Sequence, residues 1–318
     1  MSNSSPTFDL PAIDVVIPAF NCSDVLERCL SRLKAQDYYG QIRIIVVDGG
    51  SSDGTAEIAA KFGAQVFINS GMYGTGLNGA RHFGENVGSA PYVWILDSDN
   101  LLVESSAARD MIRPFLDDPG IQITIPETAI DPYASSFNNW ISLVEIENVN
   151  QMKRVSTYKN GYYVIVDMFY GITNASIIKR EALESAGGYD SDLRLLRRLR
   201  RLGLSKGAIV PTAHFYHNQV KSAFEFYRKW NRRIVKFGSM TDEELKSYFV
   251  EYPVSVEESK HLTSGTQSSL LSAPVQAIAS FLKTGNTNWL WGTLYPFIMA
   301  SIIIRHPVHS RNVYGRFL

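Results

Sequence analysis

Two aspartates separated by one residue close an apolar run in the segment YVWILDSDN, residues 92–100. Alternate residues of an extended segment point to the same side, so Asp97 and Asp99 can present both carboxylates to one ligand. Mg²⁺ is usually held by one or two carboxylates together with substrate phosphates, so the pair fits a metal ion that bridges the protein and a diphosphate. Asp, Ser and Asn are also ordinary turn residues, and a solvated turn is the alternative interpretation.

Another carboxylate ends an earlier apolar run, in IRIIVVDGGSSDGT, residues 42–55. There Asp48 can accept hydrogen bonds from a nucleobase or a ribose, and Gly49 lets a ligand approach the backbone closely. Asn21 follows a further apolar run, IDVVIPAFN, residues 13–21. One glycine-rich turn indicates only a connection between a strand and a helix. Two acidic strand ends in one chain are a stronger indication of a ligand site.

Elements that alternate along the first hundred residues must position these side chains. Each apolar run reads as a strand, and each is followed by a segment with apolar residues at helical spacing, at 23–36, 56–63 and 78–88. Strands that are apolar throughout predict a mostly parallel sheet with helices on both faces, an α/β fold. In such sheets ligands bind beyond the carboxyl ends of the strands. The polar residues expected there are Asn21, Asp48, Asp97 and Asp99.

Beyond residue 105 the alternation weakens. The spacing predicts helices over 135–158, 190–203 and 222–238, with one or two strands over 162–180. In the second of these helices Leu195, Leu196, Leu199 and Leu202 form one apolar stripe, and arginines occupy the opposite side. That basic side reads either as a solvated face or as a surface for anionic lipid or a phosphate-bearing acceptor.

Composition excludes some classes of protein. Lys plus Arg and Asp plus Glu both number 31, so the formal net charge is zero, which disfavours a nucleic-acid-binding protein. Cys22 and Cys29 are the only cysteines, too few for a zinc pattern or a disulfide framework, which favours a reducing compartment. The segment GTGLNG, residues 74–79, matches the dinucleotide pattern, but it does not follow the first strand, so an NAD(P) enzyme is disfavoured.

Four ordered motifs carry a resemblance to a known family. VVIPAFN, VVDGGSSDGT, GLNGARHFG and WILDSDN resemble the GT-A fold nucleotide-sugar glycosyltransferases of family 2, from about Val15 to about His217. The resemblance implies a Rossmann-like GT-A domain, a nucleotide-diphospho-sugar donor, a hexosyltransferase-like reaction and inversion at the anomeric carbon. It assigns Asp97 and Asp99 to the family's metal pair, which takes Mg²⁺ or Mn²⁺, and His82 stands where the family usually has asparagine.

The motif match also implies where the donor binds. Pro18, Ala19 and Asp48 would hold the nucleotide, and Arg81 would lie near the diphosphate. With the strand-end residues included, the expected donor-binding set is Pro18, Ala19, Asn21, Asp48, Gly49, Arg81 and Asp97.

An inverting transfer also needs a base that takes the proton from the acceptor hydroxyl. The family supplies it from a Glu-Asp pair at the start of a helix, after a Gly-Gly-aromatic-Asp segment, which is GGYD at 187–190 here. Counted back from Gly203, Asp192 matches the aspartate of that pair and Ser191 the glutamate. We therefore expect Asp192 to be the base, with Asp190 as the alternative. His217 stands where many members carry a histidine, either a further metal ligand or a structural residue.

The C-terminal region contains the most apolar segments, at 268–282 and 288–306. Both are short for a bilayer span of roughly 20 residues, and Pro274 and Pro296 interrupt them. Trp289, Trp291 and Tyr295 resemble interfacial anchors. We expect a cytoplasmic protein, peripheral or monotopic at the cytoplasmic membrane face, with a lipid-linked acceptor. A helical pair packed on the catalytic domain or on a second subunit is the alternative, and the oligomeric state stays open.

These expectations combine into one domain plan. Residues 1–11 form a disordered leader, 12–217 the GT-A catalytic domain, 218–262 a helical acceptor-side extension and 263–318 apolar, membrane-associated helices, with a linker near 264–269. Because Ser191 and Arg194 replace acidic residues of the family pattern, a non-catalytic nucleotide-sugar-binding subunit of a glycan-assembly complex is the alternative function.

Overall fold

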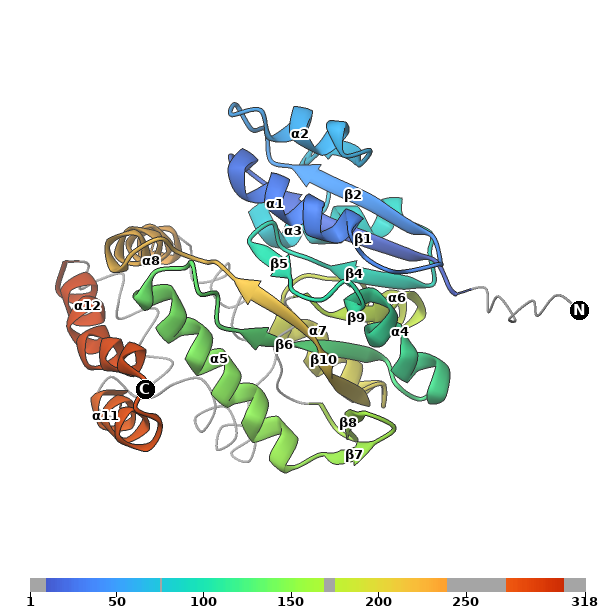
Figure 1. Cartoon of the computed structure of the whole chain (residues 1–318). Coiled ribbons are helices and arrows are strands. Elements are labelled where there is room, and N and C mark those ends of the chain that lie inside the picture. The colour runs from blue at the N-terminus through green and yellow to red at the C-terminus, as the bar shows by residue number, and fades with distance from the viewer. Residues whose placement is uncertain (1–9, 75, 169–174, 239–272, 306–318) are drawn as a thin grey trace, which may run out of the picture. The chain divides into compact units, whose positions relative to one another are not determined.

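The computed structural model describes residues 10–74, 76–168, 175–238 and 273–305 (Figure 1). Most of the expected leader, the linker near 264–269 and residues 239–262 of the expected extension lie outside the described residues. The chain divides into two compact units. The first comprises residues 1–129 and 149–217, and the second comprises residues 130–148 and 218–318.

The first unit is built on one mixed sheet. In space its strands follow the order β3-β2-β1-β4-β9-β6-β10-β8-β7, and β5 pairs with β10 (Figure 1). The strands are β1 (Ile13–Ala19), β2 (Ile42–Asp48), β3 (Gln65–Ile68), β4 (Tyr92–Ile95), β5 (Asn100–Leu102), β6 (Ile123–Ala129), β7 (Thr157–Lys159), β8 (Tyr162–Ile165), β9 (Ile177–Lys179) and β10 (Gly207–His217).

The half of the sheet around β1 is parallel, as the alternation of strands and helices predicts. β1 pairs in parallel with both β2 and β4, and β2 pairs in parallel with β3. The register sets Ala19 beside Asp48, so the carboxyl ends of β1 and β2 lie at one edge. The other half includes antiparallel strands, because β9 inserts between β4 and β6 and runs against both.

Helices cover both faces of this sheet. They are α1 (Ser23–Lys34), α2 (Thr55–Lys61), α3 (Gly76–Val87), α4 (Ala107–Asp117), α6 (Arg180–Ser185) and α7 (Asp192–Arg201), together with the end of α5 (Ser136–Arg154) from residue 149 onward. Alternation along β1 separates the two faces: Val15 and Ile17 join a core cluster with α1 and α4, while Val16 joins one with α6 and α7. Each face therefore has its own apolar core, and the expected α/β fold with helices on both faces is confirmed.

Helix α7 forms where the leucine spacing predicts it. The Ser191 hydroxyl caps it by accepting from the Arg194 backbone N–H. Leu195, Leu196 and Leu199 are buried, whereas Leu202 is 51% exposed, so its place in the apolar stripe was wrong. The helix ends at Arg201, and Leu202 lies on the turn that leaves it, outside the helical periodicity.

The second unit is helical in its described part. It contains the first turns of α5, α8 (Ala223–Gly238), α11 (Ala273–Thr284), the short helix η1 (Thr287–Leu290) and α12 (Trp291–Arg305). Its core is aromatic, and Trp291 and Tyr295 pack against Phe137 and Trp140 with ring centroids 5.3 and 5.5 Å apart. Packing within this unit is therefore sufficient to explain the partial burial of these two rings. Among the helices described, none combines the length and the apolar character needed to cross a bilayer.

Candidate active site

A buried arginine forms the centre of the site. Arg81 lies on α3, and its side chain is 3% exposed. Its guanidinium binds the Asp97 carboxylate, which follows β4, through both oxygens: Nη2 to Oδ2 at 2.5 Å and Nε to Oδ1 at 3.2 Å. A bidentate pair of this kind fixes orientation as well as charge. The structure therefore brings together two residues that the sequence predicted for the donor's diphosphate.

The same guanidinium reaches the start of α7. Arg81 Nη1 donates to the Tyr189 hydroxyl at 2.7 Å and lies 3.5 Å from Asp192 Oδ1. The guanidinium carbon also lies 5.1 Å from the centre of the Tyr189 ring, within the range of a cation–π contact. Burial alone lowers the pKa of Arg81, but the carboxylates of Asp97 and Asp192 raise it above its usual value. Arg81 thus stays charged and joins the end of β4 to the N-terminus of α7.

Asp99 faces a different partner. Its Oδ1 lies 3.8 Å from Nε2 of His217, a buried residue at the end of β10. In the antiparallel pairing of β5 with β10, His217 is opposite Asn100. Neither polar atom of the buried Asn100 amide has a hydrogen-bond partner among the described residues. Polar groups buried in this way are normally satisfied by protein, water or ligand, so the surroundings fit a site that binds a polar group.

The acidic residues near this edge do not by themselves make a complete metal cage. In the described part of the chain, no three His, Cys, Asp or Glu side chains are arranged to hold one ion. Two carboxylates are nevertheless enough for Mg²⁺ when the substrate supplies phosphate oxygens. The residues present therefore fit a metal that binds with the donor.

Asp48 lies at the end of β2, which β1 separates from β4, and it is almost fully buried. Its Oδ2 accepts from the backbone N–H groups of Gly50 at 3.2 Å and Ser51 at 2.9 Å, and its Oδ1 accepts from the Ser51 hydroxyl. The carboxylate thus holds its own turn in shape, as Asx turns do. A carboxylate has about four acceptor positions, so this turn does not exhaust its capacity to bind a nucleoside.

Asn21 ties the loop after β1 to the loop after β2. Its backbone N–H donates to Ser51 Oγ at 2.8 Å, and its side-chain Oδ1 accepts from the Ser52 N–H at 2.9 Å. Asn21 has a φ of 45°, in the left-handed region that asparagine tolerates better than most residues. The Gly49 N–H also bonds to Ala19 O at 2.8 Å. Hydrogen bonds therefore join the loops after β1 and β2, which carry the predicted nucleotide-binding residues, into one wall.

Asp190 differs from Asp192 in its surroundings. Its Oδ2 accepts from Arg198 Nη1 at 2.7 Å and lies 3.5 Å from Arg194 Nη1, while its Oδ1 accepts from the Ser191 N–H at 2.7 Å. Both oxygens of Asp190 are therefore bound, one by the N-cap residue of α7 and the other by an arginine of the helix itself. The Asp192 side chain is 41% exposed and lies beside Arg81.

Two residues of the site were not predicted from the sequence. In the sequence Tyr189 is only the aromatic residue of the GGYD segment, and its hydroxyl contact with Arg81 joins positions 108 apart. Glu85 carries no motif signal, but it follows Arg81 by four residues and so shares a face of α3. That spacing was the available signal. Glu85 is 5% exposed, and its Oε1 accepts from the Tyr189 N–H at 2.8 Å.

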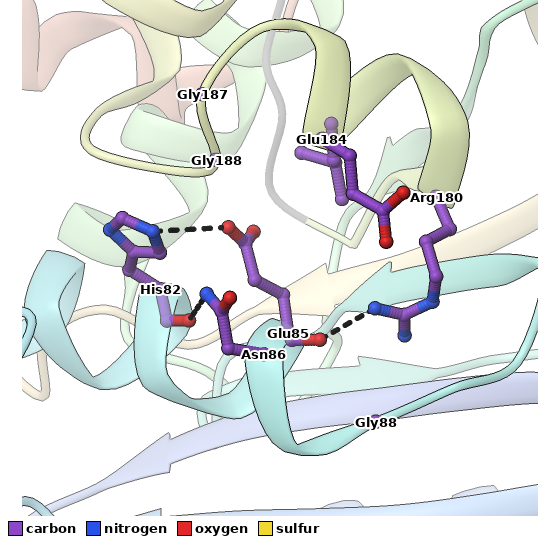
Figure 2. A pocket seen from close by; sticks show the side chains of 9 residues that line it. His82, Glu85, Asn86, Gly88, Arg180, Glu184, Gly187 and Gly188 are labelled. Atoms are coloured by element: carbon purple, nitrogen blue, oxygen red, sulfur yellow. Dashed lines mark hydrogen bonds and ion pairs between the residues drawn. The ribbon is translucent and has the colours of Figure 1, made fainter.

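A pocket of about 330 Å³ lies on the α3 side of this cluster (Figure 2). The side chains of His82, Glu85 and Asn86 extend from α3 on one side, with the Gly187–Gly188 turn and α6 on the other. The full lining is His82, Glu85, Asn86, Gly88, Arg180, Leu183, Glu184, Gly187 and Gly188.

A sheet with parallel strands that end in carboxylates, covered by helices and joined to a buried arginine, is the plan of a GT-A nucleotide-binding domain. Residues 14–187, more than half of the chain, match the family described as glycosyl transferase family 2. The chain belongs to this family.

Individual relatives agree with this assignment. Glycosyltransferase GlyA of Streptococcus pneumoniae is 27% identical over 194 residues, covering 59% of this chain and 25% of that protein. Glycosyltransferase AglJ of Haloferax volcanii is 35% identical over 109 residues, covering 34% of this chain and 33% of that protein. The matched segments thus span a third or less of either relative.

Among the solved structures that resemble this chain, one covers nearly all of it. It is the mannosyltransferase PcManGT from Pyrobaculum calidifontis in complex with GDP-Man and Mn²⁺. The two structures superimpose with a TM-score of 0.55 over 96% of this chain and 88% of that one, at 14% sequence identity. At that identity the likeness shows the shared GT-A fold alone.

Proposed function

We propose that this chain is an inverting glycosyltransferase that moves a sugar from a nucleotide-diphospho-sugar to an acceptor hydroxyl or phosphate. One observation carries the proposal: Arg81 contacts both Asp97 and Asp192, so a diphosphate-binding cation and a carboxylate suited to act as base share one cluster. Membership of glycosyl transferase family 2 and relatives named as glycosyltransferases support the reaction class.

For the donor, we assign the nucleoside to the wall formed by the loops after β1 and β2. Pro18, Ala19, Asn21, Asp48 and Gly49 are the proposed contacts. Arg81 would stabilise the charge of the diphosphate, and its bidentate pairing with Asp97 holds it ready at the end of β4.

For the metal, we assign Mg²⁺ or Mn²⁺ to Asp97 and Asp99, with His217 as a further candidate ligand. When bound, such an ion neutralises negative charge on the departing diphosphate. The 3.8 Å separation between Asp99 and His217 supports their joint assignment.

For the base, we favour Asp192 over Asp190. A base must be free to reach the acceptor hydroxyl, and the Asp192 side chain is 41% exposed at the start of α7. The Asp190 carboxylate is bound by Arg198 and by the Ser191 N–H, which suits a structural role.

For the acceptor, we propose a lipid-linked molecule reached from the membrane surface. Large apolar side chains on α11 and α12 are exposed, including Leu282 at 76% and Phe297 at 72%. Amphipathic helices bind the bilayer interface through such side chains. This assignment is independent of the donor chemistry.

The reaction is tested by release of nucleoside diphosphate over a panel of nucleotide sugars, with Mg²⁺, Mn²⁺ or a chelator. We expect turnover with one donor class, loss of turnover with chelator, and recovery when Mn²⁺ is added back. Asp99→Asn should lose most of that turnover. Chelator-resistant turnover would contradict the metal assignment, and tight binding of a nucleotide sugar without turnover on any acceptor would favour the non-catalytic alternative.

The membrane assignment is tested separately by flotation with vesicles of phosphatidylcholine and phosphatidylglycerol. We expect the wild type to float with the vesicles and the double variant Leu282→Gln, Phe297→Gln to remain behind. Both side chains are exposed, so the variant should fold normally. A wild type that stays in the aqueous fraction would refute this assignment while leaving the transfer reaction unaffected.

A further inference from the structure

Glu85 lies one helical turn after Arg81 on α3 and is buried beneath the Gly187–Gly188 turn (Figure 2). Its Oε1 accepts the Tyr189 N–H at 2.8 Å, and its Oε2 has no hydrogen-bond partner among the described residues. Unpaired carboxyl oxygens are costly to bury, so a carboxyl group in this position calls for a compensating role.

The turn above Glu85 fits only because it lacks side chains. Gly188 has a φ of 82°, in the left-handed region. A Cβ there would lie 2.4 Å from Glu85 Oε1 and 2.5 Å from His82 Nε2. The backbone of the turn therefore rests directly on the side chains of α3. Tyr189, the next residue, is fully buried in a core cluster.

From Tyr189 the contacts continue to the site. The buried ring lies against the Arg81 guanidinium, and its hydroxyl accepts from Arg81 Nη1 at 2.7 Å. Arg81 in turn binds Asp97. Glu85 and Arg81 both lie on α3, and both contact Tyr189: Glu85 binds its backbone N–H, and Arg81 binds its hydroxyl.

We propose that Glu85 is a positioning residue: it holds the Tyr189 backbone and so fixes the Arg81 guanidinium for the donor's diphosphate. This inference rests on the proposed transferase function. Glu85 does not contact the site's carboxylates in any described hydrogen bond; it acts through Tyr189.

Burial has the largest effect on the protonation of Glu85, and the surrounding charges modify it. Burial raises the pKa of Glu85 to about 8, against the opposing effect of Arg180 and Arg198 and with support from Asp190 and Glu184. The nearby imidazole of His82 has its pKa lowered, first by burial, so it adds little positive charge at neutral pH. Glu85 is therefore neutral near pH 7 and becomes charged above about pH 8.

Ionisation should weaken the hold on Tyr189. A charged carboxylate favours hydration, and the pocket of about 330 Å³ beside Glu85 offers room for it to turn away from the Gly187–Gly188 backbone. The Tyr189 N–H would then lose its acceptor, and Arg81 would lose a fixed neighbour. Binding of the donor should weaken on the alkaline side.

The first test is Glu85→Gln, which keeps an acceptor oxygen but cannot ionise. KM for the donor and kcat are measured from pH 6 to pH 10. The wild type should lose roughly tenfold in kcat/KM above pH 8, mainly through KM, whereas E85Q should stay within about threefold of its neutral value. Identical alkaline limbs in the two proteins would overturn the inference.

The second test is a double-mutant cycle. Glu85→Leu removes the acceptor for the Tyr189 N–H, and Tyr189→Phe removes only the hydroxyl that Arg81 contacts. Each should raise donor KM by about tenfold, and the double variant should be no worse than the worse single variant, because both changes break one chain of contacts. Additive effects would show that Glu85 does not act through Tyr189.

Two readouts do not need turnover and separate this inference from the proposed function. Hydrogen exchange at the Tyr189 amide should speed up at least about tenfold in E85L but not in E85Q. Folded Glu85 keeps its proton up to about pH 8, whereas the ordinary value is 4.5, so wild-type stability should fall relative to E85Q between these pH values. If no donor is turned over, the proposed function fails; if protection and stability are the same in all variants, the role of Glu85 fails.

Discussion

Asp48 and Asp97 both follow apolar strands of the same parallel half-sheet, yet different parts of the chain satisfy their carboxylates. Asp48 is bound by Gly50 and Ser51 of its own turn. Asp97 is bound by Arg81, and Arg81 also contacts Tyr189 and Asp192, more than 100 residues along the chain. The hydrogen bonds of Asp48 come from residues close in sequence, whereas those of Asp97 form only when distant parts of the domain pack together.

The difference has an energetic consequence. Each hydrogen bond from the turn to the buried Asp48 contributes about 1 kcal/mol, and its donors on Gly50 and Ser51 are exposed or half-buried, so water can replace the carboxylate as their acceptor. A buried arginine that loses its partners, or a carboxylate that loses its arginine, is left as an uncompensated charge. Changes around Asp97 should therefore affect both stability and transfer, whereas changes around Asp48 should mainly affect binding of the donor.

The largest effect is expected from Arg81→Leu. It leaves Asp97 without its bidentate partner in a site where that carboxylate is mostly buried. We expect a loss of about 3–5 kcal/mol in the free energy of unfolding and a loss of turnover of at least about a hundredfold. Urea unfolding and nucleoside-diphosphate release measure the two effects.

Arg43→Leu is the matched control for this change. Arg43 also binds a buried carboxylate, that of Asp14 at 2.6 Å, but Asp14 keeps Arg180 as a partner at 2.7 Å. Its removal should cost only about 1.5 kcal/mol and leave kcat unchanged. If Arg43→Leu lowered stability and turnover as much as Arg81→Leu, the proposed difference between the surroundings of Asp97 and other buried carboxylates would be contradicted.

The next largest effect, from Asp192→Asn, is expected on turnover and not on stability. Asp192→Asn should lower kcat by about 10² to 10⁴-fold, because it removes the proposed base. Its side chain is 41% exposed, so stability should change little. Steady-state kinetics with saturating donor and a thermal melt measure the two quantities.

Asp190→Asn controls for charge removed from the same loop. It weakens the pairing with Arg198 and should lower stability while keeping kcat within about threefold of wild type. If Asp190→Asn abolishes turnover and Asp192→Asn does not, the two roles are reversed.

The sequence predicts one side of this comparison better than the other. Strand ends, the helices that follow them and the turn after Asp48 are determined by residues close in sequence, and all appear where the pattern indicates. The motif match predicts roles for the arginine on α3 and the aspartate at the start of α7, but no sequence pattern indicates that their side chains meet.

What could not be predicted depends on distant packing. The partial burial of Trp291 and Tyr295 depends on α5. From the sequence alone, aromatic residues in an apolar segment resemble anchors at a membrane interface. The sequence predicts one or two strands over 162–180, where β8 and β9 form, but three residues of β9 carry no signal that it inserts antiparallel between β4 and β6. Tyr189 and Glu85 gain their roles only because the Gly187–Gly188 turn rests on α3, a contact between positions about 100 apart.

A smaller effect is expected from changes to Asp48, at the end of β2. Asp48→Asn keeps one acceptor oxygen for the turn but removes the charge, and it should raise donor KM by about tenfold with little change in kcat. Asp48→Ala removes every acceptor, and it should also cost about 1–3 kcal/mol of stability. Kinetics over a donor range and urea unfolding distinguish them. A large loss of kcat in Asp48→Asn would place this residue with the reacting groups and remove the distinction from Asp97.

The smallest effect concerns the link between the two loops of the nucleoside wall. The Ser51 hydroxyl donates to Asp48 and accepts from the Asn21 N–H, so Ser51→Ala removes both bonds and should cost about 1–2 kcal/mol. Ser52→Ala is the control, because Ser52 reaches Asn21 through its backbone N–H, which alanine retains. We expect Ser51→Ala to raise donor KM about threefold and Ser52→Ala to leave it unchanged. Neither should alter the metal dependence, since both lie beside Asp48; a shift in Mn²⁺ requirement in Ser51→Ala would show that the two strand ends act as one site.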